Sequence, residues 1–231
     1  MSASAQGGAT PRELPDTLPA RLAELARTRP DRVALREKRY GIWQQMTWRE
    51  YHRAVSAAAR MLWELGVGAG GRVSILSDNR PEWVIADLGA QSIGAQSIGI
   101  YQTNPPPDVA YIVNDSDSTV VFVEDQEQLD KVVEVRDETP QVEHVVIMDP
   151  RGTRDVDDPR LMTWERFLER GYELLDAEPE WIDGRLAELD PDAASMVIYT
   201  SGTTGHPKGA MISSRNVLET SGELVEMIGL T

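Results

Sequence analysis

Short apolar segments alternate with segments of helical periodicity through the middle of this 231-residue chain. The apolar segments are nearly free of polar side chains, as in parallel strands that are buried on both faces. Connections long enough to hold a helix join each strand to the next, which favours right-handed crossovers and an open sheet. The strands are expected at Val73 to Leu76, Ile98 to Tyr101, Thr119 to Val123 and Val145 to Met148, with helices opening at Pro81 and spanning Asp108 to Val113 and Gln126 to Arg136.

The pattern therefore predicts an α/β fold with a mostly parallel sheet flanked by helices on both faces. In such sheets ligands bind beyond the carboxyl ends of the strands, so function is expected in the loops that follow them. We expect strands near 73, 98, 119 and 145 to lie parallel in one sheet.

Local signals define several elements outside this region. Residues 1–16 are rich in Ser, Ala, Gly and Pro and are expected to form a flexible leader. Thr17 and Pro19 indicate a helix that stops before Pro30, and a second helix is expected to begin with a capping box at Thr47 to Glu50 and to end at Gly66. Further expectations are strands at 33–36 and 42–46, an acidic loop over 150–162, and helical structure over 163–189 with breaks near Gly171, Pro179 and Gly184.

Charge and composition exclude several classes of function. The net charge of −15 argues against a nucleic-acid-binding surface, and residues 115–192 hold 24 of the 38 acidic but only 8 of the 23 basic residues. We interpret this acidic region as a solvated outer face, with a docking surface as the alternative. The chain has no cysteine, which excludes disulfides, thiolate metal sites and cysteine nucleophiles, and its three histidines are too scattered to suggest a metal site. With neither a transmembrane segment nor a signal peptide evident, a cytoplasmic location is the default expectation.

One segment has the composition of a phosphate-binding loop. It follows an apolar strand at 196–199 and runs from Thr200 to Gly209, with the sequence TSGTTGHPKG. Glycines let backbone N–H groups approach an anion, hydroxyls add donors, and Lys208 adds a positive charge. A flexible turn between two strands would be the alternative. The segment is not a Walker P-loop, because that motif ends in Gly-Lys followed by Ser or Thr.

Tyr199 to Gly209 resembles the phosphate-binding signature of the adenylate-forming (AMP-binding) superfamily, which includes acyl-CoA synthetases, luciferases and peptide-synthetase adenylation domains. Asn79 to Asp87 and Val121 to Gln128 are similar to its long-chain fatty-acyl-CoA synthetase branch. The resemblance covers residues 14–231. It implies that residues 17–231 are the N-terminal part of the large domain, a partial adenylation domain whose C-terminal portion and whose C-terminal domain are absent.

By this resemblance the parent enzyme activates a fatty acid with ATP and Mg²⁺ to an acyl-adenylate, which coenzyme A then converts to acyl-CoA. The resemblance assigns the ATP phosphates to Thr200, Ser201, Gly202, Thr203, Thr204, Gly205 and Lys208. It places no catalytic residue and no metal ligand within this chain. We therefore expect the 231-residue chain alone to bind ATP weakly and to make no acyl-CoA. We also expect it either to self-associate through uncovered apolar surface or to have a mobile loop at 201–208.

Two positions depart from the family pattern. Ser214 stands where the family commonly has His, and Ala210 where it often has Val. Ser213 or Ser214 is expected to cap the last helix instead of lining an acyl pocket. Two alternatives to the fatty-acid ligase remain open at this point. They are adenylation of a different carboxylic acid, and a non-catalytic nucleotide-binding or interaction module that docks through residues 115–192.

Overall fold

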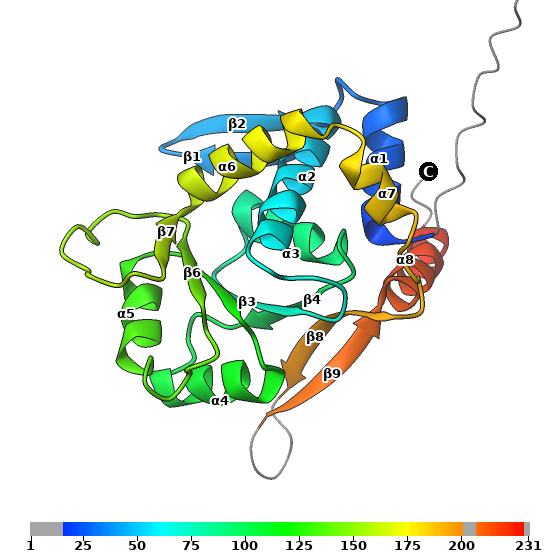
Figure 1. Ribbon diagram of the computed structural model, residues 1–231. Coiled ribbons are helices and arrows are strands. Elements are labelled where there is room, and N and C mark those ends of the chain that lie inside the picture. Colours follow the sequence, from blue (N-terminus) through cyan, green and yellow to red (C-terminus); the bar gives the residue numbers. More distant parts are fainter. Residues whose placement is uncertain (1–15, 201–206, 229–231) are drawn as a thin grey trace, which may run out of the picture.

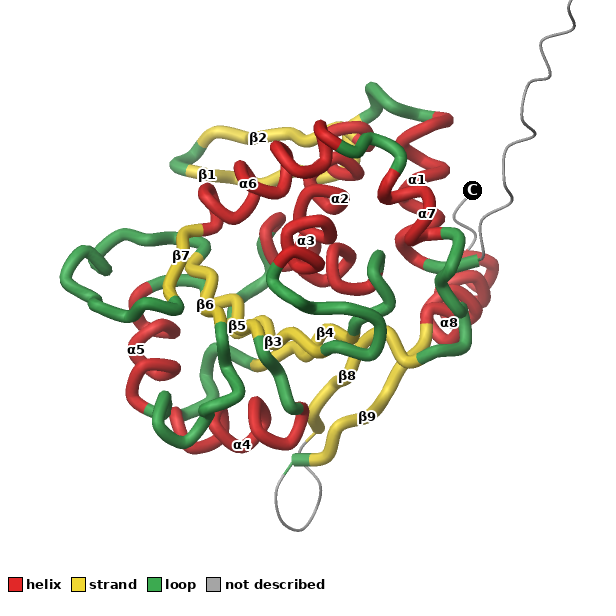
Figure 2. The backbone as a smooth tube through the Cα atoms, in the orientation of Figure 1, coloured by secondary structure: helices red, strands yellow, loops and turns green. Residues whose placement is uncertain are grey.

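The computed structural model describes residues 16–200 and 207–228. In this part of the chain, a seven-stranded sheet lies between two groups of helices, and a two-stranded hairpin stands apart from it (Figures 1 and 2). The hairpin consists of β1 (Val33–Arg39) and β2 (Ile42–Thr47), and the sheet of β3 (Arg72–Leu76), β4 (Gln96–Ile100), β5 (Val120–Val123), β6 (His144–Ile147), β7 (Leu161–Thr163), β8 (Ala194–Thr200) and β9 (Lys208–Ser213). The helices are α1 (Leu18–Thr28), α2 (Trp48–Glu64), α3 (Pro81–Gln91), α4 (Pro106–Ser116), α5 (Gln126–Glu134), α6 (Trp164–Ala177), α7 (Trp181–Leu186) and α8 (Ser214–Ile228).

The sheet is parallel except for its last strand. Its order is β7-β6-β5-β3-β4-β8-β9, and only β9 runs antiparallel to its neighbour β8. The strands predicted near residues 73, 98, 119 and 145 are β3 to β6, and they pair in parallel, as expected. This confirms the predicted α/β class with a mostly parallel sheet, and it places the loops after β3, β4, β5, β6 and β8 along one edge.

Alternate residues of the sheet face two separate cores. Phe122 of β5 points toward α6, where its ring lies 5.4 Å from that of Phe167 in an edge-to-face arrangement, with Trp164 beside them. Its neighbour Val121 faces the opposite way and packs in a second core with Leu129 of α5. Helices α2, α3 and α6 cover the first face and α4 and α5 the second (Figure 1).

The predicted ends of two helices are confirmed. The Thr17 side chain accepts a hydrogen bond from the Ala20 amide at the start of α1. At the start of α2, Thr47 and Glu50 cap each other's backbone in the predicted capping box. Gly66 has a φ of +86°, the left-handed conformation that favours glycine after a helix.

Two expectations for residues 150–189 are wrong. The expected loop over 150–162 ends in a strand, β7, which pairs in parallel with β6. The predicted break near Pro179 is confirmed, but Gly171 lies inside the continuous helix α6 and Gly184 inside α7. Gly171 is there because α6 packs tightly on α2, where a Cβ at this position would lie 2.2 Å from the Ala57 carbonyl oxygen.

The leader predicted at residues 1–16 lies almost entirely outside the described residues. Within the part of the chain that the structure covers, no helix has the length and apolarity required to cross a lipid bilayer.

Candidate functional site

The strands on either side of the glycine- and hydroxyl-rich loop bring its two ends together. Thr200, the last residue of β8, pairs directly with Lys208, the first residue of β9, and both are exposed. Strand β8 is parallel to β4, so the loop leaves the sheet at the carboxyl edge, where α/β proteins bind ligands. The predicted positions Ser201, Gly202, Thr203, Thr204 and Gly205 lie outside the described residues.

Helix α4 holds both ends of this loop. The Tyr199 hydroxyl donates a hydrogen bond to Asp115 Oδ2 at 2.6 Å, and the Tyr111 hydroxyl donates one to the Pro207 carbonyl oxygen at 3.2 Å. Burial, together with the Asp115 carboxylate, raises the pKa of Tyr199 far above its usual value, so this hydroxyl remains a donor. The sequence analysis did not identify these anchors. Their one visible signal is the spacing of Tyr111 and Asp115, which lie on one face of a helix.

Gly209 of β9 leaves room for the side chains of Val197 and Tyr199 on the neighbouring strand β8. It pairs with Tyr199 across the ladder, and a Cβ at Gly209 would lie 2.7 Å from Val197 Cγ1 and 3.3 Å from Tyr199 Cζ. The lack of a side chain at this position is thus a packing requirement of the β8–β9 pair, in addition to any role in the loop.

The two serines before α8 have structural roles. Ser213 Oγ accepts a hydrogen bond from the Asn216 amide at 3.2 Å, and Asn216 Oδ1 accepts one from the Ser213 amide at 3.1 Å. The expected cap is therefore Ser213. Buried Ser214 accepts a hydrogen bond from the Leu18 amide at 3.3 Å, which joins the start of α8 to the start of α1.

A second polar group lies at the carboxyl ends of β3 and β5. Arg80 donates two hydrogen bonds to Glu82, at 2.8 and 3.0 Å, and lies 3.8 Å from Glu124. Glu124 also accepts a hydrogen bond from the Asp78 amide at 2.7 Å. Asp78, Arg80 and Glu124 line a polar cavity of about 390 Å³ together with Tyr40 and the end of β1. Arg80 and Glu82 belong to the stretch Asn79 to Asp87 of the sequence analysis and lie on either side of Pro81, the first residue of α3.

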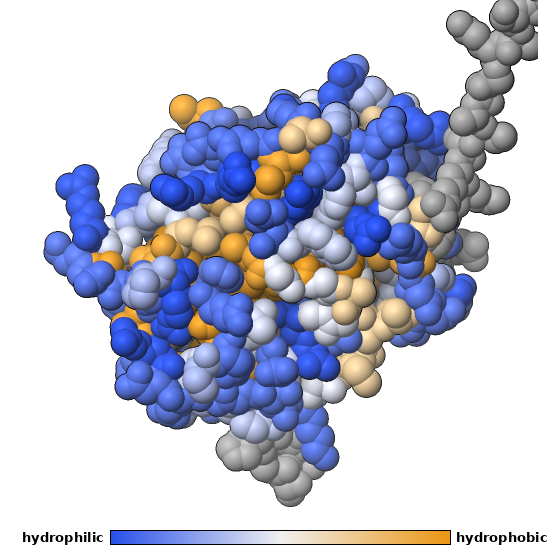
Figure 3. Space-filling view, in the orientation of Figure 1, coloured by the Kyte–Doolittle hydropathy of each residue, from blue (hydrophilic) through white to orange (hydrophobic). Residues whose placement is uncertain are grey.

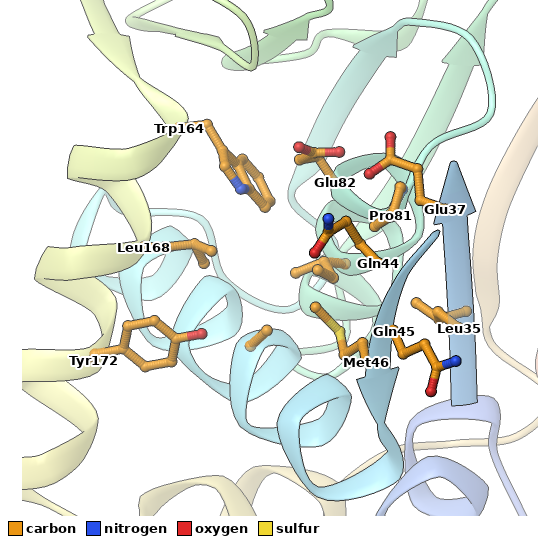
Figure 4. A pocket seen from close by; sticks show the side chains of 12 residues that line it. Leu35, Glu37, Gln44, Gln45, Met46, Pro81, Glu82, Trp164, Leu168 and Tyr172 are labelled. Carbon is orange, nitrogen blue, oxygen red and sulfur yellow. The ribbon is translucent and has the colours of Figure 1, made fainter. Parts of the chain in front are cut away.

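An apolar cavity of about 200 Å³ lies beneath the hairpin (Figure 4). Leu35 and Met46 line it from the hairpin, and Trp164, Leu168 and Tyr172 line it from α6. Since none of its lining comes from α4, β8 or β9, this cavity is separate from the loop.

No group of three His, Asp or Glu side chains able to hold a metal ion occurs among residues 16–200 and 207–228.

The class of the fold is thus an α/β protein whose parallel sheet ends, at its carboxyl edge, in a β8–β9 pair with Lys208 at the start of the antiparallel strand, the edge where such sheets bind ligands. Comparison with known families makes this specific. The model of the family described as "AMP-binding enzyme" matches residues 22–228, and the chain belongs to this family.

Curated relatives are long-chain fatty-acid–CoA ligases. The chain is 34% identical over 191 residues to ACSBG2 of Xenopus laevis, an alignment that covers 83% of this chain and 25% of the relative. It is 32% identical over 203 residues to FadD15 of Mycobacterium bovis, covering 88% and 32%. The chain thus spans about a quarter to a third of the length of these relatives.

Solved structures share the fold. A fatty acyl-CoA synthetase of Mycobacterium tuberculosis superposes with a TM-score of 0.66 at 23% identity, covering 86% of this chain and 35% of that one. The anthranilate CoA ligase AuaEII in complex with anthranoyl-AMP superposes with a TM-score of 0.68 at 24% identity, covering 93% and 37%.

Proposed function

We propose that this chain supplies the ATP phosphate-binding segment of an AMP-forming ligase that converts a long-chain fatty acid to acyl-CoA. The observation that carries the proposal is the pairing of Thr200 with Lys208 at the carboxyl edge of the sheet, in a chain whose curated relatives are fatty-acid–CoA ligases. The solved anthranilate ligase shares the fold, so the class of acid is the part of the proposal that needs its own test.

In the proposed reaction, a carboxylate oxygen of the fatty acid attacks the α-phosphorus of ATP. The bond from this phosphorus to the bridging oxygen of the β-phosphate breaks, and pyrophosphate leaves. The thiol of coenzyme A then attacks the acyl carbonyl, AMP leaves, and the thiol proton passes to solvent. Magnesium would arrive bound to ATP and offset part of the phosphate charge.

The role we assign to this chain is to hold the β- and γ-phosphates. Negative charge grows on them as pyrophosphate departs, so donors fixed in advance stabilise the transition state more than bound ATP. Thr200 and Lys208 would act from opposite ends of the loop, and Ser201 to Gly205 would supply backbone and hydroxyl donors between them. The contacts from α4 to Tyr199 and Pro207 support this role, because they limit the movement of both ends.

The binding test uses the 231-residue chain. Lys208→Ala is expected to weaken ATP binding about 10-fold or more in equilibrium dialysis, since a charge-assisted hydrogen bond is lost. Lys38→Ala removes an exposed lysine from the hairpin and serves as the matched control, with unchanged affinity. Equal ATP affinity of wild type and Lys208→Ala would contradict the assignment of Lys208.

The reaction test follows pyrophosphate release with ATP, magnesium and a panel of fatty, aryl and amino acids. It is run on the 231-residue chain and on the gene product that carries it. We expect release with long-chain fatty acids from the gene product, and no acyl-CoA from the 231-residue chain by itself. Preference for an aryl or amino acid would reassign the substrate. Nucleotide binding without pyrophosphate release from any acid would favour a non-catalytic module.

A further inference from the structure

The tip of the β1–β2 hairpin exposes three large apolar or aromatic side chains. Tyr40, Ile42 and Trp43 are 77%, 65% and 61% exposed, and they lie within four consecutive residues. Figure 3 shows a small apolar patch over β2, at the upper left of the molecule, surrounded by hydrophilic side chains. A single exposed apolar side chain needs no explanation, but a group of three at one projecting turn indicates contact with something else.

The backbone of the turn supports this conclusion. Tyr40 and Gly41 have φ values of +49° and +81°, so both central residues of the two-residue turn are left-handed. Asn-Gly is the usual choice in such turns, and a tyrosine in this conformation is strained. The Tyr40 hydroxyl accepts a hydrogen bond from Arg151 at 3.2 Å, which offsets part of this strain within the fold. The side chain nevertheless stays 77% exposed at the tip.

The two faces of the hairpin differ in chemistry. Leu35 and Glu37 point inward and line the apolar cavity (Figure 4). Successive residues of a strand alternate between faces, so Arg36 and Lys38 lie on the opposite, outer face. Lys38 pairs directly with Trp43 across the hairpin, which places the aromatic ring on that outer face too. Glu37 is the only acidic residue between positions 33 and 47, so the outer face is cationic and aromatic.

The net charge of residues 27–53, which include the hairpin, is opposite in sign to that of the whole chain. Residues 27–53 contain 8 of the 23 basic residues and only 3 of the 38 acidic ones, in a chain with a net charge of −15. An anionic surface would repel most of this molecule and attract the outer face of the hairpin. Asp78, Glu124, Asp125 and Asp149 line the polar cavity together with Glu37 of the inner face, so the attraction is confined to the outer face. Three apolar side chains make a patch far smaller than the roughly 800 Å² per partner of a stable protein interface. A bilayer can accommodate such a small insertion, with basic side chains on its headgroups.

We propose that the β1–β2 hairpin docks this protein on the surface of an anionic lipid bilayer. Trp43 on the outer face and Tyr40 at the tip enter the interface between headgroups and acyl chains, and Arg36 and Lys38 contact the lipid phosphates. The hairpin is a surface contact and does not span the membrane. This inference does not depend on the proposed function, since vesicle binding is measured without ATP, fatty acid or coenzyme A.

The test is co-sedimentation of the 231-residue chain with vesicles. One set is phosphatidylcholine alone and the other is phosphatidylcholine mixed with phosphatidylglycerol. We expect binding to the anionic vesicles only, and weaker binding as salt is raised. Arg36→Gln combined with Lys38→Gln is expected to lower the partition coefficient more than 10-fold, since each basic residue near an anionic membrane contributes about fivefold. Trp43→Ser is expected to lower it about fivefold or more.

The controls make equal chemical changes away from the hairpin. Arg136→Gln with Arg215→Gln removes two exposed cations, and Met227→Ser removes a side chain that is 77% exposed on α8. Both should bind vesicles as wild type does, and urea unfolding checks that every variant is folded. The proposal is overturned if wild type does not bind anionic vesicles, or if the hairpin variants bind them as wild type does. It is also overturned if Trp43→Ser abolishes a dimer in sedimentation equilibrium while vesicle binding is unchanged, which would assign the patch to a second copy.

Discussion

Asp87 is a carboxyl group buried on α3, only 6% exposed. Its Oδ1 accepts hydrogen bonds from Gln91 Nε2 at 2.8 Å and from Ser97 Oγ at 2.5 Å. No basic side chain forms an ion pair with it in the part of the chain that is described. Burial raises the pKa of Asp87 above its usual value, and this effect exceeds the opposite effect of the two hydrogen bonds. Asp87 therefore keeps its proton in the folded protein to a higher pH than in the unfolded chain.

This difference makes stability depend on pH in a defined direction. In the unfolded chain the Asp87 carboxyl ionises near its ordinary pKa of about 3.9. Between that pH and the raised pKa of the folded state, the folded protein binds more protons than the unfolded chain. The free energy of unfolding therefore falls as the pH rises through this window. Asp87→Asn removes this dependence and is expected to stabilise the protein by about 1–3 kcal/mol at neutral pH, since no buried charge can form.

The measurement is urea unfolding of wild type and Asp87→Asn at about pH 5 and about pH 8. Wild type should lose more stability than the variant between the two conditions. Asp130→Asn, an equal change at an exposed position of α5, is the control and should keep the wild-type dependence. If Asp87→Asn also keeps it, Asp87 does not retain its proton on folding.

Tyr199 allows a second residue-scale prediction. Tyr199→Phe removes the 2.6 Å hydrogen bond to Asp115 that joins β8 to α4. A hydrogen bond to a charged group contributes about 1.5–3 kcal/mol, so we expect a stability loss in that range. Tyr101→Phe removes a hydroxyl from a side chain that is 71% exposed and should change stability little. Equal urea midpoints for Tyr199→Phe and wild type would show that this bond contributes nothing to stability.

Two glycines inside helices lead to opposite predictions at the scale of elements. Alanine is better than glycine inside a helix by about 1 kcal/mol, so propensity alone favours both Gly171→Ala and Gly184→Ala. A Cβ at Gly171 would lie 2.2 Å from the Ala57 carbonyl oxygen of α2, whereas a Cβ at Gly184 meets nothing within 4 Å. The packing of α6 on α2 therefore leaves no room for a methyl group at position 171.

We expect Gly171→Ala to destabilise the protein by about 1–3 kcal/mol, because α6 must move away from α2. Gly184→Ala should stabilise it by roughly 0.5–1 kcal/mol. Thermal unfolding followed by circular dichroism compares the two variants directly. A stabilising Gly171→Ala would show that the two helices can separate at no cost.

At the scale of the whole molecule, the acidic region sets how stability responds to salt. Residues 115–192 hold 24 of the 38 acidic residues against 8 of the 23 basic ones, so like charges repel one another in the folded state. Raising sodium chloride from about 0.05 to about 0.3 M should screen this repulsion and raise the melting temperature by a few degrees.

A variant with reduced charge checks this explanation. Asp155→Asn, Asp157→Asn and Glu169→Gln neutralise three exposed acids of the region. The triple variant should melt higher than wild type in low salt and gain less from added salt. An equal gain in both proteins would mean that salt acts by some means other than screening these charges.

The sequence by itself determined the features that depend on neighbouring residues. Periodicity and apolar runs predicted the strands β3 to β6 and the helices between them. Thr17 with Pro19 predicted the start of α1, and the pair Thr47 and Glu50 predicted the capping box of α2. The TSGTTGHPKG segment indicated the family that the comparison confirmed. It also named Thr200 and Lys208, which the β8–β9 pairing brings together. The phosphate-binding roles of these two residues and of Ser201 to Gly205 stay predictions.

Only the tertiary structure decided the features made by residues distant in the chain. Strand β7 has three residues, too few to show a period, and it is held by pairing with β6. Gly171 is helical because another helix packs against it, and the loop is anchored because Asp115 and Tyr111 of α4 reach β8 and Pro207. The burial of Asp87 and the outward face of the hairpin arise in the same way. Local patterns encode backbone conformation, whereas burial and side-chain partners are set by contacts that exist only after the chain has folded.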